Sequence, residues 1–174
     1  MTPELRQKES SAGEKGFAWP APPYLEFVPA KDRSGRADCL LIFRDDTQAT
    51  GRLRSFMADA ALLTFQPDGA AEAVSVPFSS LLKLQLLQPV ALRRESATTL
   101  AAAAATEENR YAERYPFRIE LVNGEKFLGL TLGYVSALCG LFLYFPEENG
   151  RVVRCFVPAQ AAKTCSIDAP IGQV

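Results

Sequence analysis

The chain has 174 residues, of which 48% are apolar, and its 19 basic and 20 acidic side chains give a net charge of −1. This length allows one ordinary domain or two small ones, and the apolar content is sufficient for a folded core. The near-neutral charge gives no electrostatic reason to bind nucleic acid or an anionic membrane surface. Because the sequence contains neither a secretory signal nor an apolar run of about 18 residues, we expect a cytoplasmic protein without membrane insertion.

Residues 1–36 are expected to form a disordered polar tail followed by an extended strap rich in proline and aromatic residues. Proline fixes φ and removes a backbone donor, which excludes a helix around Trp19 and Tyr24. Exposed aromatic side chains at this density need cover, so one interpretation is a strap that lies across the protein's own domain. The alternative is a partner-binding segment in which Trp19 and Tyr24 make the contacts.

The first folded unit is predicted over residues 37–92. Its apolar residues alternate or run in short blocks between turn signals such as Pro67-Asp68-Gly69, a pattern typical of β-strands. Five strands are expected, at residues 39–43, 49–56, 60–65, 73–77 and 79–87. Residues 93–114 then form an Ala-rich linker with partial helicity, because alanine favours helix but no apolar stripe is present to dock one.

The second unit is predicted over residues 115–168, and residues 169–174 read as the start of a following segment. Its plan repeats that of the first unit at nearly constant spacing. Leu41, Phe43 and Gly51 match residues 78 positions later, Leu63 and Phe65 match Phe142 and Tyr144 at 79, and Val76-Pro77 matches Val157-Pro158 at 81. Five short strands expose two edges, so we predict an all-β fold of two tandem small SH3-like or Sm-like barrels, closed or half-closed, from an internal duplication.

The sequence offers little material for catalysis or for a metal site. It contains no histidine, the commonest general base, and its four cysteines (residues 39, 139, 155 and 165) form no closely spaced pair. The cysteines are expected to be small buried apolar residues. The paired carboxylates lie in predicted turns or in the linker, where charges are ordinarily solvated. We therefore predict that the protein is not an enzyme and has no catalytic residues, no cofactor and no metal.

Three binding functions remain open. The hairpin from Phe117 to Glu125, with Asn-Gly at its turn and Gly129 in its second strand, resembles the Sm-like fold. That resemblance implies RNA binding. However, the Arg-Gly dipeptide that such RNA binders use near their last strands is missing, and neither unit is net basic. Nucleic acid is therefore the least favoured of the three ligands.

Arg110-Tyr-Ala-Glu-Arg114 resembles the R-x-x-x-R motif that precedes the barrel in PilZ domains. The resemblance implies a cyclic dinucleotide, whose phosphate and guanine edges two guanidinium groups would bind bidentately. A second PilZ motif is matched only at Ser136, because Tyr134 replaces the acid or amide and Gly140 comes one residue late. The alternative ligand site is thus Arg110, Arg114, Ser136 and Gly140.

Ile171-Gly-Gln-Val174 resembles the opening of the N-terminal module of type II secretion and type IV pilus assembly ATPases. Segments 19–24 and 133–142 are also similar to leader regions in that group. The resemblance implies a non-catalytic regulatory or docking module that binds a protein of the secretion or pilus machinery. We favour this function and expect the partner surface on an open strand edge or on Trp19 and Tyr24.

Overall fold

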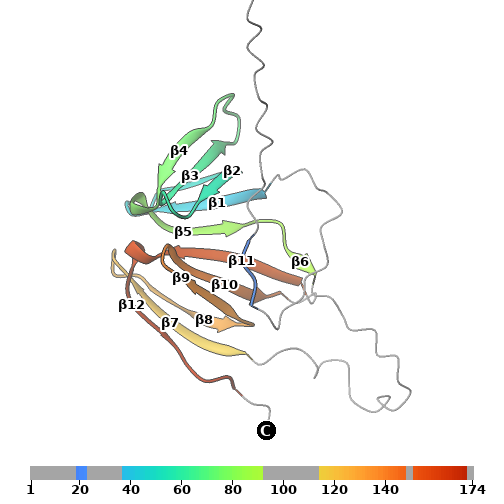
Figure 1. Ribbon diagram of the computed structural model, residues 1–174, viewed down its shortest axis with the longest axis vertical. Coiled ribbons are helices and arrows are strands. Elements are labelled where there is room, and N and C mark those ends of the chain that lie inside the picture. The colour runs from blue at the N-terminus through green and yellow to red at the C-terminus, as the bar shows by residue number, and fades with distance from the viewer. Residues whose placement is uncertain (1–18, 23–36, 92–113, 148–150, 172–174) are drawn as a thin grey trace, which may run out of the picture.

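The computed structural model describes residues 19–22, 37–91, 114–147 and 151–171. Regular structure in these residues consists of β-strands and two short 3₁₀ turns, with no α-helix (Figure 1). The predicted all-β class is therefore confirmed. The tail, the linker, Tyr24 and Arg110 lie outside the described residues, so the predictions about them stay predictions.

The first unit contains five strands and a 3₁₀ turn that precedes the last strand. Its elements are β1 (Ala37–Phe43), β2 (Gln48–Met57), β3 (Leu62–Pro67), β4 (Val74–Pro77), η1 (Phe78–Ser80) and β5 (Leu81–Leu86). Buried side chains alternate with more exposed ones along most of these strands, as the apolar pattern predicts. The strands pair in the order β4-β3-β2-β1-β5, so β4 and β5 are the two edges of the unit.

The second unit contains six strands and also has a 3₁₀ turn before its last strand. Its elements are β7 (Tyr115–Leu121), β8 (Lys126–Thr131), β9 (Tyr134–Ala137), β10 (Gly140–Pro146), β11 (Arg151–Pro158), η3 (Ala159–Ala161) and β12 (Ala162–Ile167). A two-residue strand between the units, β6 (Val90–Ala91), pairs with β11. In each unit a Val-Pro pair ends the strand before the 3₁₀ turn.

The strands form two antiparallel sheets, and neither of them closes into a barrel. The large sheet has the order β4-β3-β2-β1-β5-β11-β10-β9, and the small one has the order β12-β7-β8. The prediction of closed or half-closed barrels is not matched by these open sheets. The reason is that β5, the edge expected to help close the first unit, pairs with β11 of the second unit instead (Figure 1).

Strand pairing inside the two units follows one scheme. In the first unit β1 pairs with β5 through Cys39↔Leu86, Leu41↔Leu84 and Phe43↔Leu81. In the second unit β7 pairs with β12 through Phe117↔Ile167, Ile119↔Cys165 and Leu121↔Ala162. These pairs coincide when β1 is shifted by 78 residues and β5 by 81. We call residues related by these shifts counterparts.

The first hairpin turn is also the same in both units. In the first unit the Asp45 side chain accepts the Thr47 backbone N–H at 3.1 Å, and Asp46 has a positive φ of 63°. In the second unit the Asn123 side chain accepts the Glu125 backbone N–H at 3.1 Å, and Gly124 has φ 89°. An Asx side chain followed by a left-handed residue is a common solution for such a turn. The two turns also touch, because Asn123 donates to Asp46 at 2.8 Å.

One predicted match between the units is wrong by one residue. Leu63 lies opposite Val76 in the first unit, and Leu141 lies opposite Val157, the counterpart of Val76, in the second. Leu63 therefore corresponds to Leu141 and not to Phe142, and the three extra residues fall in the hairpin between β10 and β11. Side chains alternate between the two faces of a strand. The shift of one residue therefore assigns each side chain of β10 to the opposite face from the one that the predicted match gives it.

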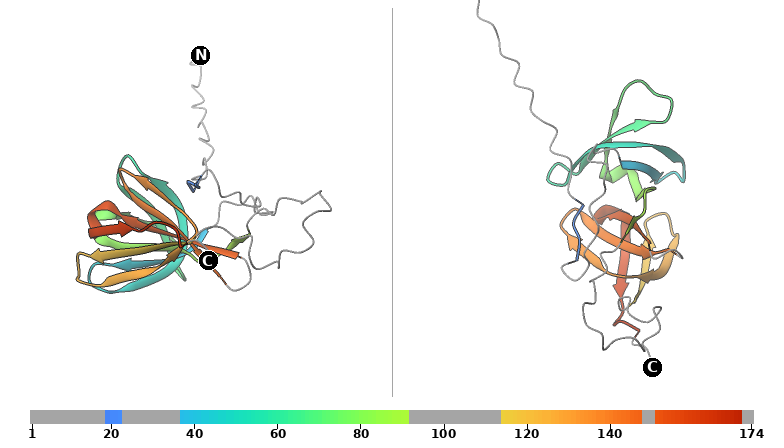
Figure 2. Two further views of the ribbon diagram at one scale, coloured as in Figure 1. Left: turned by 90° about the horizontal axis from the view of Figure 1, so that it is seen from below. Right: turned by 90° about the vertical axis from the view of Figure 1, so that its right-hand side faces the viewer.

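Two hydrophobic cores lie on the two faces of the large sheet at β5, β11 and β10. The first core holds residues of both units, among them Leu41, Leu84, Phe56, Phe78, Phe142, Tyr144 and Phe156. The second core lies between the large sheet and the small one and holds Leu82, Phe117, Ile119, Leu121, Leu143, Cys155, Val157 and Ala161. The two units are stacked one above the other and share the first core (Figure 2).

A buried threonine stabilises a break in the second unit. The counterpart of the continuous strand β2 is split into β8 and β9 at Leu132 and Gly133. Thr131 is fully buried at this break, and its hydroxyl accepts the Tyr144 backbone N–H at 3.0 Å and lies 2.5 Å from the Gly133 carbonyl oxygen. The hydroxyl thus takes the place of a backbone partner in the interrupted ladder.

We expect Thr131→Val to destabilise the protein by about 1–3 kcal/mol, because the isosteric side chain leaves the buried Tyr144 N–H without an acceptor. Thr131→Ser keeps the hydroxyl and should cost less. Urea unfolding of the two variants measures this difference. Equal stability of the valine variant and the parent protein would contradict the role given to the hydroxyl.

Candidate functional site

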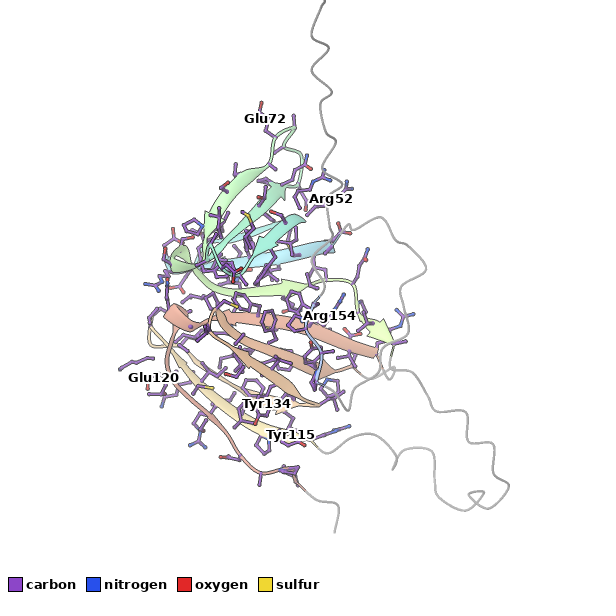
Figure 3. The ribbon with its side chains drawn as sticks, viewed as in Figure 1. Arg52, Glu72, Tyr115, Glu120, Tyr134 and Arg154 are labelled. Atoms are coloured by element: carbon purple, nitrogen blue, oxygen red, sulfur yellow. The ribbon has the colours of Figure 1, made fainter. Side chains whose placement is uncertain are left out.

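The structure places Trp19 against both units. Its ring centroid lies 6.4 Å from that of Phe56 in the first unit and 5.2 Å from that of Phe142 in the second. The guanidinium carbon of Arg154 lies 5.9 Å from the Trp19 ring (Figure 3 labels Arg154). Trp19 therefore packs on the described part of both units, and both the strap over residues 1–36 and the role of Trp19 in binding a partner stay predictions.

Burial dominates the electrostatics around Trp19. It raises the pKa of the fully buried Tyr144, while the neighbouring Arg154 acts in the opposite direction. Burial also lowers the pKa of Arg154. Arg154 forms no ion pair with the acidic residues that the structure describes, and its guanidinium lies over the Trp19 ring.

The residues of the cyclic-dinucleotide hypothesis lie on different elements. Arg114 is exposed just before β7 and pairs with Ile171 in an isolated bridge. Ser136 is exposed on β9, and Gly140 is buried at the start of β10. Gly140 has φ 151°, and a Cβ there would meet the Val157 carbonyl oxygen and the Phe156 ring. The backbone therefore requires glycine at position 140, whatever its role in binding.

The cysteines follow the sequence prediction only in part. Cys39 and Cys155 are buried, and burial raises the pKa of each thiol to about 12. Cys139 is half-buried and Cys165 is exposed, so the prediction of a buried residue is wrong for Cys165. Among the described residues no group of three or more Cys, Asp or Glu is placed to hold a metal ion.

An apolar row lies on the outer surface of the small sheet. Leu128 is 55% exposed and Leu130 is 37% exposed, and both project from β8 to the face opposite the second core. Their counterparts in the first unit are the polar residues Thr50 and Arg52. Tyr134, which is 38% exposed, contacts Tyr115 beyond the end of this strand, with ring centroids 6.1 Å apart (Figure 3).

The backbone beside this row is an open edge. Among the described strands β8 pairs only with β7, so its other side presents unpaired N–H and C=O groups. Sequence reasoning named an open strand edge but not this one. The signal for this edge in the sequence was the run Phe127-Leu-Gly-Leu-Thr-Leu132, in which both alternating sets contain apolar residues. A strand with one buried face requires only one apolar set.

Basic side chains border the apolar row. Arg118 lies opposite Leu128 in the β7–β8 ladder, and both Arg118 and Lys126 are exposed. The nearby carboxylates are already paired: Glu120 binds Lys163 at 2.8 Å, which lowers the Glu120 pKa, and Glu125 binds Lys83 at 2.9 Å. Arg118 and Lys126 form no ion pair within the described part of the chain. We call Leu128, Leu130, Arg118 and Lys126 the β8 face.

Comparison with protein-family models, curated proteins and solved structures gives no match to this chain. The described residues include no helix long and apolar enough to cross a membrane.

Proposed function

We propose that this chain is a non-catalytic protein-docking module whose binding surface is the β8 face. The observation that supports the proposal is an open strand edge with two exposed leucines at alternate positions. An extended segment of a partner can add to such an edge as a further strand, with backbone hydrogen bonds for affinity and side-chain contacts for specificity.

The chemistry of the β8 face defines the partner segment. A strand laid beside β8 would place every second side chain against Leu128 and Leu130, which favours apolar residues at alternate positions. Arg118 and Lys126, which lack ion pairs among the described residues, share this face with the two leucines, so they favour an acidic residue in the same alternating set. The proposed ligand is therefore an extended segment in which one alternating set of side chains combines apolar and acidic residues.

The finer points of fold and context are also proposals. We propose that the shared pairing scheme and the matching turns come from duplication of one SH3-like or Sm-like unit. The resemblance of segments 19–24, 133–142 and 171–174 to secretion and pilus ATPase leaders suggests that the partner belongs to such a machinery. The cyclic-dinucleotide and RNA alternatives stay predictions, because no contact among the described residues favours them.

A peptide in which one alternating set of residues reads Val-Val-Glu, with threonine between them, tests this function directly. In an NMR titration of the full chain, we expect shifts of the backbone amides from Lys126 to Leu130, because the peptide adds beside that edge. The variant L128S/L130S should bind at least about tenfold more weakly, since apolar contact area is lost. Both side chains are exposed, so stability should change by less than about 1 kcal/mol.

The first unit provides a matched control. The variant T50S/R52A alters the counterparts of Leu128 and Leu130 and should bind the peptide as the parent protein does. The same peptide with lysine in place of glutamate should bind more weakly. Absence of binding, or amide shifts confined to other strands, would contradict the proposed site.

A further inference from the structure

The two units are joined through different edges. The joint consists of β5 of the first unit and β11 of the second, paired through Gln85↔Cys155 and Leu84↔Phe156. The counterpart of β5 is β12, and the counterpart of β11 is β4. The two units are alike but are joined through two different edges, so the joint is heterologous. One edge of each kind therefore remains unpaired. Those edges are β4 and β12, at opposite ends of the molecule (Figure 1).

We infer that a second copy of this chain adds head to tail, with its β4 paired antiparallel to β12. The internal joint fixes the register of this contact. Replacing each residue of the joint by its counterpart places Val74 of one copy opposite Ser166 of the other, and Ser75 opposite Cys165. Among the described strands, β4 pairs only with β3 and β12 only with β7, so both edges are open to such a partner.

Two residues of β12 are less buried than their counterparts on β5. Leu84 and Leu86 on β5 are 0% and 3% exposed and lie in the first core, which includes Phe142, Tyr144 and Phe156 of the second unit. Their counterparts Cys165 and Ile167 are exposed and half-buried, respectively. A hairpin of the β3–β4 type would cover these two residues, and the free hairpin of that type belongs to the first unit of another copy.

Proline and lysine, which occur on the two open edges, also occur on the paired strands of the internal joint. Pro77 ends β4, and proline commonly protects an edge, but its counterpart Pro158 ends β11, which is paired. The edge β12 carries Lys163, whose counterpart on β5 is Leu82; β5, which is paired, carries a lysine at the next position, Lys83. Proline or lysine on an edge strand is therefore compatible with strand addition in this fold.

The contact between copies would be weaker than the joint within one copy. The outer face of the β10–β11 hairpin carries Phe142, Tyr144 and Phe156, whereas the counterparts in the first unit are Thr64, Gln66 and Ser75. Less apolar area is then buried between copies, so the association should be reversible and concentration-dependent. A heterologous contact of this kind builds a ring if the rotation closes and an open chain if it does not.

A disulfide between copies tests the register. Residues directly opposite in antiparallel strands have Cα atoms about 4.5–5.5 Å apart, which a disulfide can span. Under mild oxidation the variant S75C should form dimers and longer oligomers through a bond between residue 75 and Cys165, identified by peptide mapping. Adding C165S should abolish this product, and V74C/S166C/C165S should restore it through the neighbouring pair.

Two measurements can overturn the inference. The control S79C places a thiol on η1, an exposed position outside the edge, and should form less than about a tenth of the cross-linked product of S75C. Equal yields from S75C and S79C would show collision rather than strand pairing. Sedimentation velocity of the unmodified chain should show a mean mass that rises with concentration. A constant monomer mass up to millimolar concentration would exclude the head-to-tail contact, leaving the β8 proposal unaffected.

Discussion

Replacing Phe156 by alanine should destabilise the protein by about 3–5 kcal/mol, the largest effect that we expect from one side chain. Phe156 is completely buried, and its ring lies 4.8–5.1 Å from those of Phe142, Phe56 and Phe78. It also stands opposite Leu84 in the joint between the units. Its removal leaves a cavity in the core that both units share, where neighbours on two sheet segments cannot easily collapse.

Urea unfolding followed by the fluorescence of Trp19, the only tryptophan, measures this effect. Because the first core contains residues of both units, we expect a single transition that shifts as a whole. Phe127→Ala is the control, since Phe127 is only partly buried beside the second core. A cost for F156A no greater than that for F127A, or two separate transitions, would contradict the shared core.

Gly140→Ala is expected to destabilise by about 2–5 kcal/mol, because backbone strain adds to overpacking. The backbone at Gly140 has φ 151°, a conformation that residues with a Cβ rarely adopt. The added methyl group would also meet the Val157 carbonyl oxygen, the Phe156 ring and the Pro158 Cα. Nothing can move easily there, since β10 and β11 are paired at this point.

Gly124→Ala separates the two contributions to this cost. Gly124 also has a positive φ, of 89°, but a Cβ there meets nothing within 4 Å, so we expect only about 1 kcal/mol. Thermal unfolding of both variants gives the comparison. If G140A destabilises the protein no more than G124A does, the result would contradict the close approach of β10 to β11 at Gly140. The comparison also matters for the dinucleotide hypothesis, because loss of binding in G140A would report loss of the fold.

Local pattern in the sequence was sufficient to predict most strands and the repeat. Alternating apolar residues between Asp, Asn and Gly turn signals mark β1, β2 and β7, and the Val-Pro pairs mark the ends of β4 and β11. These features depend on neighbours in the chain. The prediction was therefore most accurate where one strand folds back on the next.

Long-range pairing could not be predicted in the same way. Both alternating sets of β10 are apolar, with Leu141 and Leu143 on one face and Phe142 and Tyr144 on the other, so alternation cannot decide which set belongs to the unit's own core. That ambiguity caused the error of one residue in the repeat. The second apolar face is needed because the first unit packs on it. The open large sheet follows from the same joint, which no local signal marks. The open edge of β8 follows from the break at Leu132 and Gly133, because β9 and not β8 pairs with β10.

The two like units share one sheet through β5 and β11, and the proposed binding surfaces lie where counterparts differ. Backbone NOEs in the full chain test this arrangement most directly. We predict interstrand NOEs that connect residues 84–85 with residues 155–156, together with NOEs between the turns at Asp46 and Asn123. Intact NOEs within each unit but none between these positions would contradict the claim.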